Sequence, residues 1–287
     1  MTAVKLGDAF VSDQDGIDHH EAELPSYTPT GHQDLDRILN GGLAPGQLAV
    51  ISGRTSHGKT TLALDMIRRT ALRDGRPVLF VSAEQIEDEI TMRLLSAEAN
   101  VPLAAIRTNR LTEEQLEKLT GRISPVENAP IYIEDSARTL EEIIVEAYRL
   151  SADQDLGLIV VDGLNLLTSG EDVNSRYEDV ATMSRNLKHL ARELNVPVVV
   201  TAGLSRGIEE RGDEAWPRLS DLRDSGTLEE DADIVIFVNR PDADNRDHER
   251  AGEVYFIVAK NRTGEYGTVR VAHQLHYSRF VDIAPRE

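Results

Sequence analysis

The most constraining feature of this chain is a glycine-rich turn of the form Gly-x4-Gly-Lys-Thr, which runs from Gly53 to Thr60. An apolar run, Leu48–Ile51, precedes the turn, and a helical apolar pattern follows it through Leu62 and Met66. A strand that leads through glycines into a helix aims backbone N–H groups and the positive end of the helix dipole at one point. The turn therefore predicts a nucleoside triphosphate site in an α/β domain.

Two side chains of this turn have an expected partner. Lys59 is placed to reach the β- and γ-phosphates, and the Thr60 hydroxyl is placed to hold Mg²⁺. The expected nucleotide-binding residues are those of the turn and the residue after it: Gly53, Arg54, Thr55, Ser56, His57, Gly58, Lys59, Thr60 and Thr61.

Composition excludes several kinds of site. The 287 residues contain no cysteine, so a disulfide framework and a cysteine-based zinc site are both impossible. No apolar run is long enough to span a membrane and no signal peptide is visible, so a cytoplasmic protein without a membrane partner is expected. The net charge of −19 is unusual for a nucleic-acid binder, because neutralising phosphates supplies most of such a protein's affinity. Any nucleic-acid site here must therefore be a local cluster of basic residues on an acidic background. The alternative is that the net charge only confers solubility.

The chain divides into a tail and one α/β domain. Residues 1–26 are acidic and lack periodicity, so we expect a disordered tail, followed by one domain over residues 27–287. Strands are expected at 47–52, 78–82, 131–134, 157–162, 196–202, 233–239, 253–259 and 267–273.

Helical patterns separate these expected strands. A short helix is expected at 35–39, a capping box at Thr139–Glu142 opens another, and residues 176–194 carry an apolar stripe at helical spacing. Several early strands are near-continuous apolar runs, which suit a parallel sheet covered on both faces. The alternation predicts a three-layer α/β fold with a mostly parallel sheet and an antiparallel C-terminal extension.

Two acidic residues that end apolar runs are candidates for the same site. Asp162 follows Leu158–Val161, and strand ends of an open α/β sheet meet the ligand, so Asp162 is expected to share Mg²⁺ with Thr60. Glu84 ends another apolar run. From the residues alone, Glu84 is equally well a catalytic base for water or an acid that interacts with a helix dipole.

Several further motifs resemble a known family. Besides the turn, they are Thr30–Asp36, Ser82–Glu84, Asp162–Leu166, Ser184–Lys188, Ala191–Pro197, Ser220–Gly226, Glu230–Ile234 and Ala259–Gly264. In order and spacing they are similar to the C-terminal motor domain of the DnaB-type bacterial replicative helicase, over about residues 28–281. The combination is specific, whereas the turn alone would not be.

The resemblance implies a RecA-like fold that assembles as a six-membered ring, with ATP and Mg²⁺ bound between subunits. It implies that Glu84 is the catalytic glutamate that activates water, and that Lys59 and Asp162 keep the roles given above. Lys260 and Arg262 resemble the pair that reaches into the neighbouring subunit's ATP site. An i, i+2 spacing in a strand projects both side chains the same way, and the alternative is an ordinary solvated hairpin.

Single-stranded DNA is the partner that the resemblance implies. Arg223, Asp224 and Gly226 match the loop that lines the central channel in the family, and Arg206 opens a stretch of mixed charge that could add a contact. Asp224 stands where glutamate is usual in the family.

Three departures from the family pattern bear on function. Gly203 stands where the family has the glutamine that senses the γ-phosphate, and Gly163 and Asn165 replace the usual tyrosine and glutamine. The family's helical N-terminal domain is not seen in this sequence, so contact with primase is not expected.

The sequence thus favours a Mg²⁺-dependent ATPase and DNA helicase that translocates on single-stranded DNA. Two alternatives stay open: a RecA-like assembly protein of the recombination or clock type without unwinding activity, and an ATP-dependent interaction module with negligible turnover. The set of catalytic residues favours the enzyme, whereas Gly203 and the net acidity favour the switch.

Overall fold

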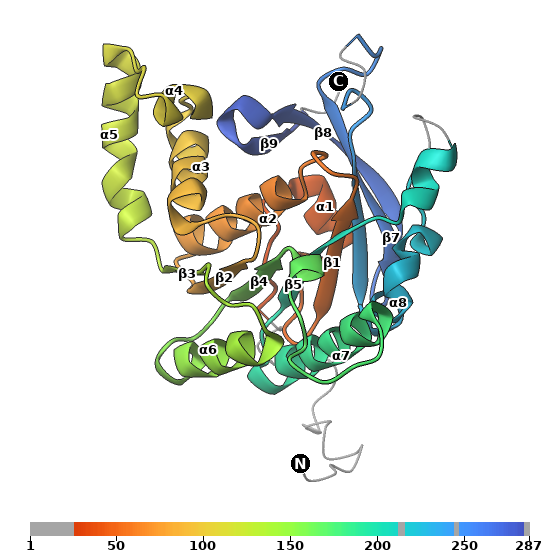
Figure 1. The fold of residues 1–287 in the computed structure, drawn as a ribbon. Coiled ribbons are helices and arrows are strands. Elements are labelled where there is room, and N and C mark those ends of the chain that lie inside the picture. The colour runs from red at the N-terminus through yellow and green to blue at the C-terminus, as the bar shows by residue number, and fades with distance from the viewer. Residues whose placement is uncertain (1–25, 212–215, 244–246, 284–287) are drawn as a thin grey trace, which may run out of the picture.

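A computed structural model of the chain describes residues 26–211, 216–243 and 247–283. The described residues form one nine-stranded sheet in the order β3-β2-β4-β5-β1-β6-β7-β8-β9 (Figure 1). The first six of these strands run parallel, and β7, β8 and β9 extend the sheet antiparallel. The strands are β1 (Leu48–Gly53), β2 (Val78–Ser82), β3 (Ile131–Glu134), β4 (Leu158–Asp162), β5 (Val198–Gly203), β6 (Ile234–Asn239), β7 (Glu253–Asn261), β8 (Gly267–Gln274) and β9 (Arg279–Asp282).

Helices cover both faces of the sheet (Figure 1). On one face lie α1 (Gln33–Ile38), α2 (Lys59–Ile67), its π-helical continuation η2 (Arg68–Arg73) and α3 (Glu87–Ala99). On the other lie α6 (Leu140–Asp153), α7 (Arg176–Leu194) and α8 (Gly226–Asp231). Beyond α3, at the side of the molecule, are α4 (Leu103–Arg107) and α5 (Glu113–Glu127).

The two helical layers bury two separate hydrophobic cores. Along β1, Ala49 and Ile51 contribute to the core on the α2 side, while Leu48 and Val50 contribute to the core on the α7 side. Successive residues of a strand point to opposite faces, so a run that is apolar throughout feeds both cores. This is why the central strands lack polar alternation.

The predicted fold class is confirmed: a three-layer α/β domain with a mostly parallel sheet and an antiparallel C-terminal part. Each strand predicted from the sequence is present, and the helix predicted at 176–194 is α7. Thr139 caps α6 through the predicted capping box with Glu142. The sequence patterns missed β9, a four-residue edge strand.

In the described part of the chain, no helix combines the length and apolar character needed to cross a bilayer. The acidic tail predicted over residues 1–26 lies outside the described residues except for Ser26.

Candidate nucleotide-binding site

The glycine-rich turn has the conformation that its sequence predicts. Gly58, with φ of 104°, adopts a left-handed conformation directly before α2, and Ser56 does so with φ of 64°. A Cβ at Gly58 would also lie 2.5 Å from the Phe280 ring, so this position accepts no side chain. The turn joins the carboxyl end of the buried strand β1 to the amino end of α2. The first N–H groups of α2 therefore point out of the helix toward this edge of the sheet.

The Lys59 side chain folds back over the turn. Its Nζ donates to the carbonyl oxygens of Gly53 at 3.1 Å and Arg54 at 3.3 Å. Burial lowers the pKa of Lys59 from its ordinary value, while the negative charges of Glu84 and Asp162 act in the opposite direction. Lys59 is therefore a half-buried cation that faces the two acidic residues expected in the site.

Asp162 is almost fully buried at the end of β4, with 1% of its surface exposed. Its Oδ1 accepts hydrogen bonds from Thr60 Oγ1 at 3.1 Å and from Thr201 Oγ1 at 2.6 Å. Its Oδ2 is buried and accepts no hydrogen bond from any residue that the structure describes. Burial raises the pKa of Asp162 because the charged form loses its hydration.

This arrangement fits Mg²⁺. A buried carboxylate oxygen without a donor is costly unless a ligand completes it, and oxygen ligands are the ones that Mg²⁺ prefers. Across residues 26–211, 216–243 and 247–283, no three acidic or histidine side chains form a ready-made metal cage. Mg²⁺ is usually held by one or two protein oxygens together with phosphates, so Thr60 and Asp162 suffice.

Glu84 lies beside Asp162. Ser82, the last residue of β2, pairs with Asp162, and the N–H of Ala83 donates to the carbonyl of Asp162 at 2.9 Å. A Cβ at Gly163 would lie 2.9 Å from Cγ of the exposed Glu84. The glycine that replaces the family's tyrosine thus leaves the space that the Glu84 side chain occupies. The structure brings Lys59, Thr60, Glu84 and Asp162 to one edge of the sheet, while their catalytic roles stay predictions.

Lys260 and Arg262 lie at the opposite edge of the sheet. Lys260 pairs with Val235 near the start of β6, whereas the glycine-rich turn follows the end of the parallel neighbour β1. Both side chains donate to the carbonyl of Glu230, so they point the same way as their spacing predicts. Neither side chain can reach the turn of its own chain, because the length of the sheet lies between them.

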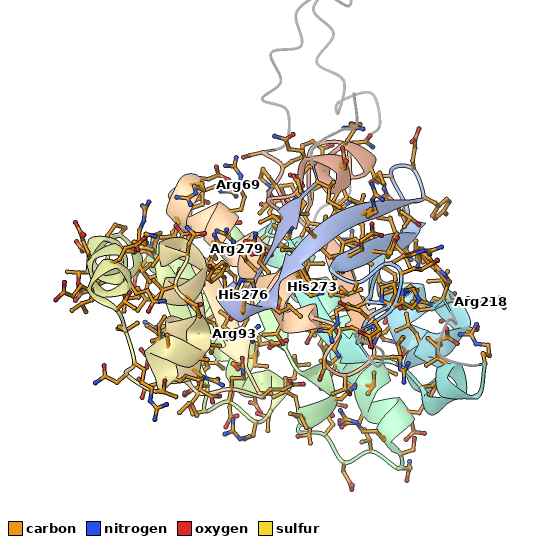
Figure 2. All side chains as sticks on the ribbon, turned by 90° about the horizontal axis from the view of Figure 1, so that it is seen from above. Arg69, Arg93, Arg218, His273, His276 and Arg279 are labelled. Atoms are coloured by element: carbon orange, nitrogen blue, oxygen red, sulfur yellow. The ribbon has the colours of Figure 1, made fainter. Side chains whose placement is uncertain are left out.

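The residues proposed for DNA are only partly described. The backbones of η4 (Arg206–Arg211) and η5 (Leu219–Ser225) are placed, but the side chains of Arg206, Arg223 and Asp224 lie outside the described residues. Gly226 begins α8 with φ of −53°, a helical value that any residue adopts. Figure 2 shows Arg218, in the same region, at the periphery of the molecule on the side away from Arg93.

Gly203 and Asn165, two of the departures from the family pattern, face each other. A Cβ at Gly203 would lie 2.9 Å from Nδ2 of Asn165, which belongs to the short helix η3 (Leu164–Leu166). A cavity of about 220 Å³ lies beside Gly203, between the glycine-rich turn and residues 203–205 and Ile208. Position 203 therefore offers only backbone toward the nucleotide site.

Comparison with known proteins identifies the family. Residues 28–282 match the family described as "DnaB-like helicase C terminal domain". The chain belongs to this family. It is similar to the replicative DNA helicase DnaB of Leifsonia xyli, with 45% identity over 267 residues, which cover 93% of this chain and 58% of that protein. The chain thus spans less than two thirds of the length of this relative.

Solved structures agree with the assignment to the DnaB-like family. A DnaB-like replicative helicase, whose structure was described together with its interactions with primase, superposes with a TM-score of 0.85 and 31% identity, covering 90% of this chain and 62% of that one. The RadB recombinase, at 19% identity and a TM-score of 0.55, shares the fold alone. The comparisons therefore support the DnaB-like alternative and not the recombinase one.

The structure adds a candidate site residue that the sequence patterns missed. Arg93, on α3, donates to Thr61 Oγ1 at 3.0 Å and to Gln85 Oε1 at 2.6 Å. Burial lowers the pKa of Arg93, and the charge of Asp162 opposes this. Arg93 therefore joins the first turn of α2 to the residue after Glu84. No sequence pattern marked Arg93 as part of the site, since its contact with Thr61 depends on how α3 packs on α2.

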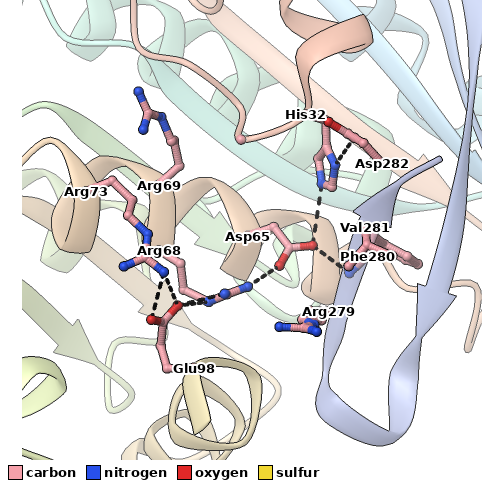
Figure 3. Close-up of a pocket in the computed structure, with 11 residues that line it drawn as sticks. His32, Asp65, Arg68, Arg69, Arg73, Glu98, Arg279, Phe280, Val281 and Asp282 are labelled. Atoms are coloured by element: carbon pink, nitrogen blue, oxygen red, sulfur yellow. Dashed lines mark hydrogen bonds and ion pairs between the residues drawn. The ribbon is translucent and has the colours of Figure 1, made fainter. Parts of the chain in front are cut away.

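Polar side chains also gather at the far end of α2, around a hollow of about 280 Å³ (Figure 3). The Asp65 carboxylate pairs with Arg68 at 2.8 Å and accepts from the N–H of Phe280 at 2.9 Å. The buried His32 ring lies between Asp282, at 3.0 Å, and Asp65, at 3.5 Å. Burial lowers the pKa of His32, but the hydrogen bonds and charges of Asp282 and Asp65 outweigh it and raise the pKa to about 9.

Proposed function

We propose that this chain is the ATP-hydrolysing motor part of a DnaB-like replicative DNA helicase. The observation that carries the proposal is the group of side chains at the carboxyl edge of β1, β2 and β4, where Lys59, Thr60 and Asp162 meet beside Glu84. Family membership supports the same activity.

The proposed roles follow from the contacts. Lys59 exchanges its bonds with the turn carbonyls for the β- and γ-phosphates. Mg²⁺, held by Thr60 and Asp162, supplies charge neutralisation for the phosphates when bound. Glu84 is exposed beside the site and orients or deprotonates the attacking water. Because catalysis of phosphoryl transfer depends on positioning and charge, a further cation at the γ-phosphate, in addition to Lys59 and Mg²⁺, would complete this set.

A neighbouring subunit supplies that cation in our proposal. Lys260 and Arg262 project together from the edge of the sheet opposite to the turn, so a head-to-tail ring would bring them to the next subunit's site. We propose a hexameric ring with single-stranded DNA in its channel, which is the assembly that family membership supports. Residues Arg206, Arg223, Asp224 and Gly226 are proposed to line the DNA path.

The proposal is tested by ATP hydrolysis with and without single-stranded DNA. We expect Mg²⁺-dependent turnover that DNA stimulates, and a loss of about 100-fold or more in Glu84→Gln, whose ATP binding survives. Arg262→Ala should also lose about 1000-fold, and mixing it with Glu84→Gln should not restore the full rate. Wild-type turnover in an enforced monomer would contradict the role of Lys260 and Arg262 across subunits.

A second candidate function is an ATP-dependent switch with little turnover. The specific observation in its favour is the bare backbone at Gly203, which leaves the proposed γ-phosphate sensor without a side chain. Turnover that DNA leaves unchanged at low and moderate salt would favour the switch over the helicase.

A further inference from the structure

The hydroxyl of Thr201 joins two neighbouring strands at the metal carboxylate. Thr201 lies on β5 and is 1% exposed. Its Oγ1 donates to Asp162 Oδ1 at 2.6 Å and accepts from the N–H of Gly163 at 2.8 Å. One side chain of β5 therefore holds both the last residue of β4 and the peptide that follows it.

The two hydroxyl donors to Asp162 determine which of its carboxylate oxygens stays without a hydrogen bond. Thr60 and Thr201 both donate to Oδ1, and Oδ2 has no donor among the described residues. A carboxylate with one oxygen tied on two sides has little freedom to rotate. Hydrogen bonds from a second layer of residues generally fix metal ligands in this way, and losing one commonly costs about 10–100-fold in metal affinity.

Thr201 is also the last side chain of β5 that faces the nucleotide site. Residues i and i+2 of a strand share a face, so Gly203 is the next position on the same side. Gly203 is not held by an unusual backbone angle, and what a side chain there would meet is the amide of Asn165, at 2.9 Å. Where the family pattern places a sensing side chain, this chain offers Thr201 two residues earlier.

The strand that carries Thr201 leads directly to the segments proposed for DNA. After Gly203 the chain enters η4, and the N–H of Ser205 donates to the carbonyl of Asp221 in η5 at 2.9 Å. Asp221 in turn accepts from the N–H of Arg218 at 2.7 Å and pairs with Arg211. A shift of β5 would therefore move η4 and η5 together.

We propose that Thr201 is a positioning residue that orients Asp162 for Mg²⁺ and thereby couples metal–nucleotide binding to β5 and its loops. This inference rests on the proposed function, since it assigns a positioning residue to the same nucleotide site. Thr201 takes over, through the metal carboxylate, the coupling that a side chain at position 203 would otherwise provide.

The test replaces the hydroxyl and follows Mg²⁺. Thr201→Val keeps the shape but removes the donor and acceptor, and Thr201→Ser restores both. Binding of a fluorescent ATP analogue is titrated with Mg²⁺ and repeated in EDTA. We expect Thr201→Val to raise the half-saturating Mg²⁺ concentration about tenfold or more, with Thr201→Ser within about twofold of wild type. Binding in EDTA should be the same in all three proteins.

A matched control is Thr70→Val. Thr70 lies in η2, at the end of α2 remote from Thr60, is fully buried too, and its hydroxyl donates to the carbonyl of Met66 at 2.9 Å. We expect the control to alter stability without altering the Mg²⁺ dependence. If Thr201→Val does not fold, Thr201→Cys carries the test, because a thiol is a weak donor of similar size and the chain has no other cysteine.

The coupling has its own readout. At saturating Mg²⁺, the stimulation of ATP turnover by single-stranded DNA should fall several-fold in Thr201→Val and persist in Thr201→Ser. An unchanged Mg²⁺ dependence in folded Thr201→Val overturns the positioning role, and an unchanged stimulation overturns the coupling. If the wild-type protein shows no Mg²⁺-dependent binding at all, the proposed function fails instead.

Discussion

A buried carboxylate lies near each end of α2, and the two differ in whether the protein supplies cations that pair with them. At the amino end, Asp162 is 1% exposed and has an oxygen without a donor among the described residues. At the far end, the buried Glu98 pairs with Arg68 at 2.7 Å and with Arg73 at 2.9 Å. Burial raises the pKa of both, but the two arginines outweigh it for Glu98, whose pKa lies below its ordinary value.

This difference shows where the protein's own side chains satisfy a buried carboxylate and where they leave one of its oxygens without a donor. The protein supplies its own cations where α2 must be anchored to α3 and β9 (Figure 3). At the nucleotide end, the donors among the described residues reach Oδ1 of Asp162 and not Oδ2. A buried carboxylate oxygen without a donor costs stability, and we propose that a cation bound together with the nucleotide completes it.

Neutralising each carboxylate in turn should give the largest contrast between the two ends. Glu98→Gln removes the buried charge that pairs with both Arg68 and Arg73, and it leaves the partly buried Arg68 with Asp65 as its remaining acidic partner. We expect it to lower the free energy of unfolding by roughly 3 kcal/mol or more. Asp162→Asn removes a charge that burial disfavours, so the ligand-free protein should lose little stability or gain some. Urea unfolding of both variants at neutral pH checks this. Equal losses in the two would mean that Asp162 is anchored like Glu98.

A pH series gives a smaller effect at the far end of α2. His32 has a pKa of about 9 in the folded protein against 6.5 as its ordinary value, because Asp282 and Asp65 face it. Its protonated form therefore stabilises the fold fully below pH 6.5, and this contribution is lost as the pH rises through about 9. At about 1.36 kcal/mol per pH unit, the contribution is roughly 3 kcal/mol at most.

The measurement is the free energy of unfolding from about pH 6 to about pH 10, which brackets the titration of His32. His32→Asn should flatten the decline. His273→Asn is the control, since His273 pairs with Asp242 at 2.8 Å away from α2 and should leave the contribution of His32 in place. An identical decline in wild type and His32→Asn would show that His32 does not cause it.

Local patterns were enough to predict most of the fold. The apolar runs of β1, β4 and β5 and the capping box of α6 are signals carried by neighbouring residues, and they placed these elements correctly. The edge strand β9 was missed because four residues with one buried aromatic, Phe280, show no clear alternation. Its place is fixed by packing on α2, which the sequence does not display.

The candidate site divides in the same way. The glycine-rich turn was predicted from its motif and Asp162 from the end of an apolar run, and the resemblance added roles for Glu84, Lys260 and Arg262. The contacts of His32 with Asp282, of Thr201 with Asp162 and of Arg93 with Thr61 could not be predicted, since each joins residues of different helices, strands or loops that only the fold brings together. His32 and Asp282, for example, are 250 positions apart.

The central proposal is that Asp162 binds the Mg²⁺ that accompanies ATP. The direct measurement is the unfolding temperature of wild type and Asp162→Asn, each in EDTA, in ATP with EDTA, and in ATP with Mg²⁺. We predict that Mg²⁺ and ATP together stabilise the wild type, by about 2.7 kcal/mol at roughly a hundredfold excess over the dissociation constant. The part of this gain that requires Mg²⁺ should be absent in Asp162→Asn. An equal Mg²⁺-dependent gain in both proteins would contradict the proposal.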